Sequence, residues 1–169
     1  MGEGPGDLHA LAVEYLAACV AALDTIPDYE TELLGAPLRS LVAPGPPAFD
    51  CCDQLAVHVA PITEREVVKG SNINQVNLIV HITRCVPMPD DDGNPPPPSE
   101  QQAAAAQINA DKWALWNYLH MLIEDGLLFE RCCGVLWGTL SPLTPSGGCG
   151  GSQLTLTVCF DGYEAVPST

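Results

Sequence analysis

The stretch "NQVNLIVHITRCV", residues 74–86, decides the fold of this chain because its side chains alternate in character. The apolar side chains recur at every second position, at Val76, Leu78, Val80 and Ile82. A period of two is typical of a β-strand that buries one face and leaves the other in polar surroundings. The segment is therefore predicted to be a strand of a sheet with one covered face.

A second alternating segment precedes this strand and predicts a hairpin. In "QLAVHVAPITE", residues 54–64, the apolar side chains again share one face. If residues 64–74 connect the two segments, the register that sets Val57 opposite Ile82 brings the two apolar faces together. A slip of one residue would set apolar side chains against polar ones. The agreement of the faces indicates an antiparallel pair.

The N-terminal segment has the period of a helix. Residues 7–24 are predicted to be helical, with Asp7 as the N-cap and an end before Pro27. The apolar face of this helix comprises Leu8, Leu11, Tyr15, Cys19 and Ala22. A strand at Leu38–Val42 is expected to follow at the edge of the sheet, since the prolines after it exclude a place in the sheet interior.

A longer helix is predicted between Ser99, which forms a capping box with Gln102, and a stop at Gly126. The residues that follow the helical period are Ala105, Ile108, Lys112, Leu115, Trp116, Leu119, Leu122 and Ile123. Four consecutive prolines, Pro95–Pro98, stand before it and favour polyproline II, which makes the connection a stiff spacer. This helix is expected to cover the sheet.

The closing segment, residues 132–160, predicts a second hairpin around the glycine-rich "GGCGGS". The expected register pairs Leu136 with Val158 and Leu140 with Leu154. The chain is therefore predicted to be one α+β domain over residues 1–169, with a mainly antiparallel β-sheet and an N-terminal helix and one long helix packed on one face. Long loops are expected at residues 63–75, 86–98 and 141–152.

The composition narrows the classes of function. With 21 acidic and 6 basic residues, the net charge of −15 argues against a protein that binds nucleic acid by neutralising phosphates. No apolar run reaches the length that spans a bilayer, and the first residues lack a basic, apolar signal peptide, so the chain is expected to be soluble, without a membrane partner.

The sequence carries no motif that predicts catalysis. A GxSxG elbow, a Walker A loop, an HExxH helix and a GxGxxG turn before a helix are all missing from it. The "GGCGGS" run lies between strands rather than before a helix N-terminus, where phosphate is bound. The chain is therefore predicted not to be an enzyme and to need no cofactor.

Eight cysteines and four histidines raise the question of metal binding or cross-linking. The adjacent cysteine pairs lack the spacing of zinc ligands, so small buried thiols are the default and no metal site is predicted. A disulfide between Cys52 and Cys85, or between Cys51 and Cys149, is the alternative. His58 and His81 are expected to face each other on the polar surface of the sheet.

Trp137 is the tryptophan best suited to contact another subunit. In the expected register of the second hairpin it shares a face with Thr155, Thr157 and Cys159 rather than with the leucines. A tryptophan on a polar face is a candidate for a buried contact in an assembly.

Several stretches together resemble the small neck proteins of actinobacteriophages, and most of all the tail terminators of siphophages. They are the alanine-rich first helix, "PGPPAFDCCDQLAVHV", "ITRCVPMPDDDGNPPPPSEQQAAAA", the helix with two tryptophans, and "GGCGGSQLTLTV". The resemblance covers nearly the whole chain and lies in the order and character of its segments. It carries no catalytic signature.

The resemblance implies a structural virion protein of the neck, assembled in the host cytoplasm. Tail terminators form hexameric rings that cap the last ring of tail-tube protein and offer the other surface to the head-completion (stopper) proteins. An acidic lumen would let phage DNA pass without specific binding. The three long loops and Trp137 are then the expected contact surfaces, with Asp90, Asp91 and Asp92 in the second loop and Lys69 and Asn72 in the first.

Two alternatives remain at this point. The first is the neighbouring neck component, a head-completion or stopper protein, which does similar work one ring higher. The second belongs to another class, a small cysteine-rich metal or redox-binding protein. Elemental analysis for bound metal, set against a ring of about six subunits in a metal-free sample, separates the two classes.

Overall fold

The computed structural model describes residues 7–26, 33–47, 53–68 and 71–161 of the 169-residue chain. In chain order the elements are α1 (Leu8–Asp24), β1 (Arg39–Ala43), β2 (Gln54–Val59), β3 (Thr63–Val68), β4 (Ser71–Cys85), α2 (Pro98–Glu124), β5 (Gly134–Ser146) and β6 (Cys149–Asp161). The strands form one sheet in the order β1-β2-β4-β6-β5, and β3 pairs with β4. All pairs are antiparallel except β1 with β2.

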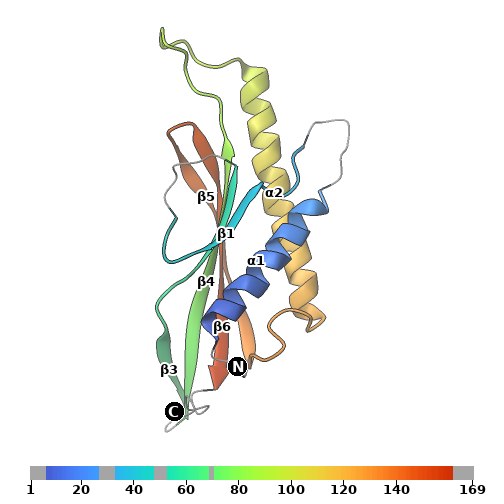
Figure 1. The fold of residues 1–169 in the computed structure, drawn as a ribbon, viewed down its shortest axis with the longest axis vertical. Helices are drawn as coiled ribbons and strands as arrows, with labels where there is room; N and C mark the ends of the chain where they lie inside the picture. Colours follow the sequence, from blue (N-terminus) through green and yellow to red (C-terminus); the bar gives the residue numbers. More distant parts are fainter. Residues whose placement is uncertain (1–6, 27–32, 48–52, 69–70, 162–169) are drawn as a thin grey trace.

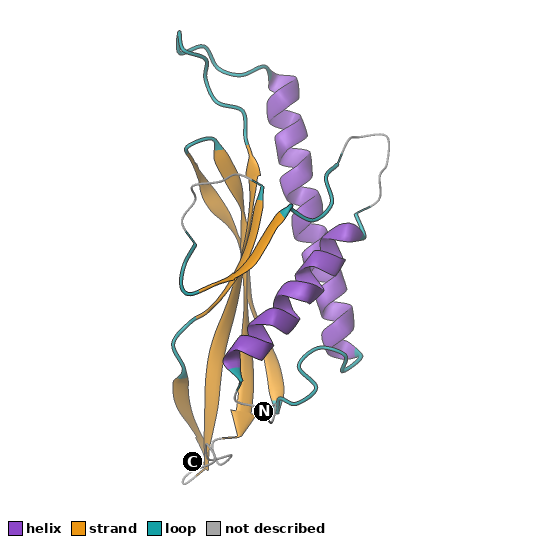
Figure 2. Ribbon diagram, viewed as in Figure 1, coloured by secondary structure: helices purple, strands orange, loops and turns teal. Residues whose placement is uncertain are grey.

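Both helices lie on the same side of this sheet (Figures 1 and 2), which confirms the α+β prediction. The core is the layer between the helices and the sheet. The alternating residues of the 74–86 stretch supply its centre, since Val76, Leu78, Val80 and Ile82 are buried. Tyr15 and Leu119 contribute from α1 and α2. The sheet is therefore covered by helices on one face, as its alternation predicts.

The first helix forms as expected. The carboxylate of Asp7 accepts a hydrogen bond from the N–H of Ala10 at 3.0 Å, so Asp7 is the N-cap of α1. The predicted face of this helix is buried at Leu11, Tyr15 and Cys19. The hydroxyl of Thr25 then donates to the carbonyl of Ala22 where the helix ends.

The second helix starts two residues earlier than predicted and without the expected capping box. Pro97 is its N-cap and Pro98 its first residue, and no side chain caps it. Proline is suited to this first position because it has no N–H to satisfy and its φ is already helical. The helix ends at Glu124, and Gly126 follows with φ of +68°, which agrees with the predicted stop.

The first hairpin differs from the prediction by two residues. Val57 pairs with Val80 rather than with Ile82. The faces agree with the prediction because a shift of two positions preserves the side of the sheet. The reason lies in residues 63–75, which were expected to be a loop. They form β3 and the start of β4, and these two segments pair with each other.

The second hairpin is partly as predicted. Leu140 pairs with Leu154, but Leu136 pairs with Thr157 instead of Val158. An irregularity between Trp137 and Leu140 shifts the register by one residue, and the pattern of alternating residues does not reveal such a bulge. Residues 141–152 are also not a long loop, because β5 and β6 extend into this range and a turn at Gly147 and Gly148 joins them.

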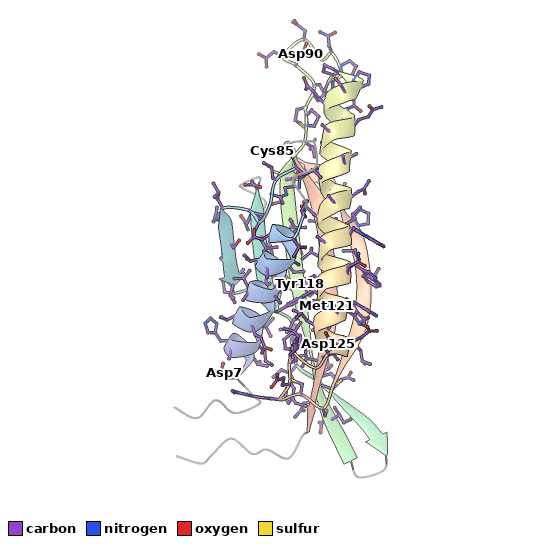
Figure 3. All side chains as sticks on the ribbon, turned by 90° about the vertical axis from the view of Figure 1, so that its right-hand side faces the viewer. Asp7, Cys85, Asp90, Tyr118, Met121 and Asp125 are labelled. Atoms are coloured by element: carbon purple, nitrogen blue, oxygen red, sulfur yellow. The ribbon has the colours of Figure 1, made fainter. Side chains whose placement is uncertain are left out.

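The predicted connection at residues 86–98 is a loop up to Pro97. The chain rises from the end of β4, turns at its tip and returns to α2, and the first turns of α2 project beyond the sheet (Figures 1 and 3). We call residues 86–97 the arm. No helix in the described part of the chain has the length and apolar character needed to cross a membrane.

Candidate interaction surfaces

The tip of the arm is an ordered acidic turn. The carboxylate of Asp90 accepts hydrogen bonds from the N–H groups of Asp92 and Asn94, at 3.1 and 2.8 Å, and from the side-chain amide of Asn94 at 2.9 Å. These bonds, led by the one from the Asn94 side chain, lower the pKa of Asp90. Asp91 is exposed beside them. The tip therefore presents carboxylates on a fixed backbone.

A buried ion cluster holds the base of the arm. Arg84, the residue before the last one in β4, donates from Nε and Nη2 to the two carboxylate oxygens of Asp111 at 2.8 and 2.9 Å. Its Nη1 donates to Asp53, and Nη2 also donates to the carbonyl of Gly35 at 2.6 Å. Gln107 donates its amide to Asp111 at 2.9 Å. The strand before the arm and the helix after it are thus joined.

Burial alone would lower the pKa of Arg84, but the hydrogen bonds and charges of Asp111, and then of Asp53, raise it above its ordinary value. The guanidinium therefore stays charged at all working pH values. Arg84 and Asp111 are 3% and 1% exposed, so the pair is shielded from solvent. A bidentate arginine–carboxylate pair of this kind fixes geometry as well as charge.

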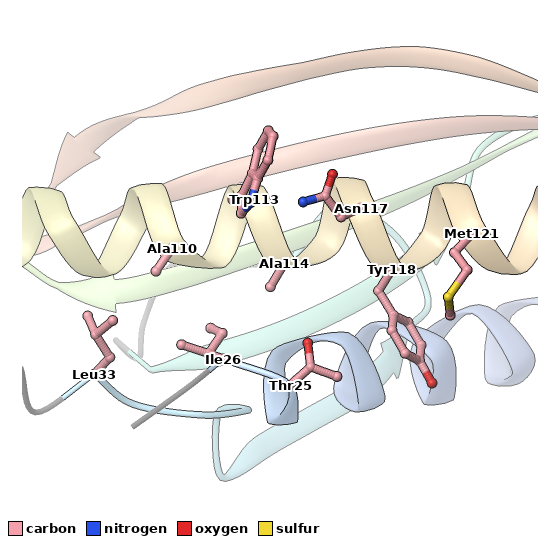
Figure 4. Close-up of a pocket in the computed structure, with 9 residues that line it drawn as sticks. All are labelled: Thr25, Ile26, Leu33, Ala110, Trp113, Ala114, Asn117, Tyr118 and Met121. Atoms are coloured by element: carbon pink, nitrogen blue, oxygen red, sulfur yellow. The ribbon is translucent and has the colours of Figure 1, made fainter. Parts of the chain in front are cut away.

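An apolar groove lies on the outer side of α2. Its volume is about 540 Å³ and nine residues line it: Thr25, Ile26, Leu33, Ala110, Trp113, Ala114, Asn117, Tyr118 and Met121. The small side chains of Ala110 and Ala114 leave the space that forms the groove. Thr25, Ile26 and Leu33 face these alanines across the groove (Figure 4). Trp113 is 69% exposed and Met121 46% exposed. Such exposure of large apolar side chains marks an interaction site more often than a free surface.

The face of the sheet away from the helices, which we call the open face, has a distinct composition. The register places charged residues at its margins, Asp161 opposite Ile73 and Arg39 on the edge strand β1. Between them, in β4 and β6, the face comprises Gln75, Asn77, Ile79, His81, Thr83, Gln153, Thr155, Thr157 and Cys159. None of these is Asp, Glu, Lys or Arg, in a chain whose net charge is −15. At its centre the hydroxyl of Thr157 donates to the side-chain oxygen of Asn77 at 2.6 Å. Depletion of charge is a property of interface centres.

No protein-family model and no curated protein matches this chain.

The expected outward placement of Trp137 is wrong. Because of the bulge in β5, Trp137 pairs with Leu156 and lies on the helical side of the sheet, where it is half-buried. Its ring centroid is 4.9 Å from that of Trp116 and 5.0 Å from that of His120 on α2. Trp137 thus packs within its own chain.

The remaining predicted contact residues fall in different places. Asp90, Asp91 and Asp92 lie together on the arm. Lys69 lies outside the described residues, and Asn72 belongs to β4, with a side chain that is not described. Of the predicted set, the structure therefore brings only the three aspartates together.

The cysteines give a mixed result. Cys85 is an exposed free thiol, so the Cys52–Cys85 disulfide is not formed; Cys52 itself lies outside the described residues. Cys149 is disulfide-bonded, and the Cys51–Cys149 alternative stays a prediction because Cys51 is also outside them. Among the described residues, no group of three or more possible ligands is placed to hold a metal ion.

The histidine pair is brought together despite the changed register. The rings of His58 and His81 stack with centroids 5.1 Å apart, and both are buried. Burial lowers the pKa of His58. Burial, and then the charge of His58, lowers the pKa of His81 to about 4. Both rings are therefore neutral at pH 7.

We expect this pair to make the fold sensitive to mild acid. A histidine in the unfolded chain has a pKa near 6.5, whereas the pKa of His81 in the folded protein is about 4. Between these pH values the unfolded state binds a proton that the folded state does not, so the free energy of unfolding falls as the pH drops from about 6.5 to about 4. From pH 7 to pH 5 the loss due to His81 should be about 2 kcal/mol. Urea unfolding of the parent and of His81→Gln at both pH values measures it. An unchanged pH dependence in His81→Gln would refute the assignment.

The sequence interpretation missed two of these features. Arg84 is in phase with the apolar face of the 74–86 strand, and Asp111 lies four residues before the buried Leu115. A charged residue on each of two apolar faces is a signal that could have predicted a buried pair. The groove has no comparable signal, because its lining comes from segments distant in the sequence.

Proposed function

We propose that this chain is a structural virion protein of a siphophage neck, without catalytic activity. Its copies close into a ring, with six as the expected number, at the junction of head and tail. The ring ends polymerisation of the tail tube and docks the tail to the head-completion proteins. DNA passes through its lumen without being bound.

The uncharged centre of the open face, in β4 and β6, is the observation that carries this proposal. Copies with a net charge of −15 repel one another, so a surface that brings no further negative charge favours their close association. The polar and aliphatic side chains at the centre of the open face provide such a surface. A closed ring needs two different patches on each subunit, and the open face would meet a second patch of the neighbouring copy.

The arm supports the second part of the proposal, contact with stacked neighbours. It projects beyond the sheet, its tip is ordered by hydrogen bonds to Asp90, and Arg84 and Asp111 secure its base. A preordered arm loses little conformational entropy when it binds. Its exposed carboxylates suit a basic patch on a partner or the wall of a channel that must not bind DNA.

A single isosteric substitution tests the role of the open face. Asn77→Asp keeps the acceptor for Thr157 but places a negative charge at the centre of this face. We expect it to weaken ring assembly at least about tenfold, since an unpaired charge in an interface costs 2 kcal/mol or more, about thirtyfold in affinity. Sedimentation velocity on the parent and the variant measures the distribution of species.

Asn109→Asp is the matched control, because Asn109 is exposed on α2 and the chemical change is the same. Its ring should be as stable as that of the parent. Equal loss of assembly in both variants would mean that net charge alone matters. Undisturbed rings in Asn77→Asp would remove the open face from the interface.

A further inference from the structure

We infer that the groove between the end of α1 and the outer side of α2 binds an apolar segment flanked by lysine or arginine, supplied by a protein other than this chain. The groove lies on the helical side of the sheet, whereas the ring contact proposed above uses the open face. The inference therefore does not depend on ring formation.

The lining of the groove fits apolar anchors. All nine side chains are uncharged, and the small Ala110 and Ala114 leave room between larger neighbours. Trp113 is largely exposed to solvent and Met121 is about half exposed. An exposed tryptophan beside a hollow is the type of residue that dominates binding energy in protein interfaces. Burying these groups against leucine or phenylalanine side chains is favourable on apolar area alone.

The surroundings of the groove are negative at both ends. Asp24 is exposed beside the lining residue Thr25. Glu124 and Asp125 are exposed three and four residues after Met121, so the helical period places them at its end of the groove. Glu124 lies 3.0 Å from the Nε2 of His120 but is 69% exposed. Carboxylates in these positions favour a partner with cationic flanks.

The helix dipoles add to this field. Both α1 and α2 end beside the groove, and neither has a basic residue in its last turn. The carbonyl groups at a helix C-terminus carry about half a negative charge, which attracts cations and is usually offset by lysine or arginine. Lys112, the basic residue of α2, is half-buried and lies further back along the helix. The partial negative charges at the C-terminal ends of both helices can therefore attract the cations of a partner.

A second copy of this chain fits poorly as the occupant. It carries 6 basic residues against 21 acidic ones, and one of the six, Arg84, is buried in the ion cluster. Its approach to a negative groove would be opposed by charge. A partner with an apolar anchor and a surplus of lysine or arginine around it matches both the apolar lining of the groove and the carboxylates at its ends.

Two synthetic helical peptides test this inference. The first carries leucine and phenylalanine at positions i, i+4 and i+7 with lysine elsewhere, and the second replaces every lysine with glutamate. Fluorescence anisotropy with the full-length protein should show the lysine peptide binding at least about tenfold more tightly. Its affinity should fall as salt is raised to about 0.5 M, where the Debye length is about 4 Å.

Variants separate groove binding from general attraction to an acidic protein. Trp113→Ala should weaken the lysine peptide at least about tenfold, and Asp125→Lys should weaken it several-fold. Ile62→Ala is the control, because Ile62 is 50% exposed between β2 and β3 and does not line the groove, and this variant should bind the peptide as the parent does. Trp113 is exposed, so its removal should leave the fold intact.

Three outcomes would overturn the inference. The lysine peptide could bind Trp113→Ala as tightly as the parent, which would show attraction to net charge only. A second such outcome is that neither peptide binds, which would show that the groove does not take the inferred partner. Sedimentation could instead show self-association that disappears in Trp113→Ala, which would make a second copy the occupant.

Discussion

Replacing Asp111 with alanine is expected to lower the free energy of unfolding by about 3–5 kcal/mol, because it leaves the guanidinium of Arg84 buried without its main counter-charge. Asp111 is 1% exposed and accepts two hydrogen bonds from Arg84 and one from Gln107. Arg84 cannot lose its charge to relieve the cost. Chemical unfolding at pH 7, followed by tryptophan fluorescence, measures the change.

Two further variants show whether the buried pair itself is responsible. Asp53→Asn removes the charge of a second partner of Arg84, whose side chain is 34% exposed. It should lower the free energy of unfolding by no more than about 1 kcal/mol. Asparagine also tolerates the positive φ of 62° at this position. The double variant Arg84→Met, Asp111→Leu removes both charges and should recover much of the loss. A loss for Asp111→Ala no greater than that for Asp53→Asn would contradict this account.

The expected loss bears on the proposed function as well as on stability. Arg84 is the second-to-last residue of β4, directly before the arm, and Asp111 lies on the helix that follows the arm. The pair therefore fixes both ends of the arm to one body. An arm with a loose base would have to be ordered each time it meets a partner, which costs binding free energy.

Gly151→Ala is expected to cost about 3 kcal/mol or more, or to prevent folding. Gly151 is buried in β6, where the neighbouring strand β4 lies so close that a Cβ would overlap the carbonyl oxygen of Ile82. The obstacle is backbone, which cannot rotate aside as a side chain can. The β4–β6 ladder would have to open at this point, and it is the longest pairing in the sheet. Soluble yield and the midpoint of thermal unfolding measure the effect.

Gly134→Ala is the matched control for this prediction. Gly134 is also a strand residue, but a Cβ there meets nothing within 4 Å. The substitution should change stability by no more than about 0.5 kcal/mol, because alanine restricts the unfolded chain and creates no contact. If both variants were equally unstable, the cause would be the loss of glycine in a strand rather than the close approach of β4.

The elements of the fold could be predicted where one period dominates a segment. The 74–86 strand and the two helices follow their periods and form within a few residues of the predicted bounds. Register could be predicted less well, because a slip of two residues preserves the faces, as Val57 and Val80 show. The loop at residues 63–75 was predicted as the connection of a hairpin and the loop at residues 141–152 from its glycines, but strands extend into both ranges.

The candidate surfaces could be predicted only in part. The three aspartates of the arm were identified from sequence because a run of charge beside prolines is a local feature. Trp137 was assigned to the wrong face because the bulge after it shifts the register of Gly134 to Trp137 by one residue relative to Leu140. The groove joins α2 to Ile26 and Leu33, and only the tertiary fold creates such a site.

The central claim is that copies of this chain assemble into a ring that caps a tail tube. Electron microscopy of the purified protein, alone and mixed with siphophage tail tubes, tests this claim most directly. The account predicts closed rings in the first sample and tubes that carry one ring at an end and no longer grow in the second. Monomers in the first sample, with bare and growing tube ends in the second, would contradict it.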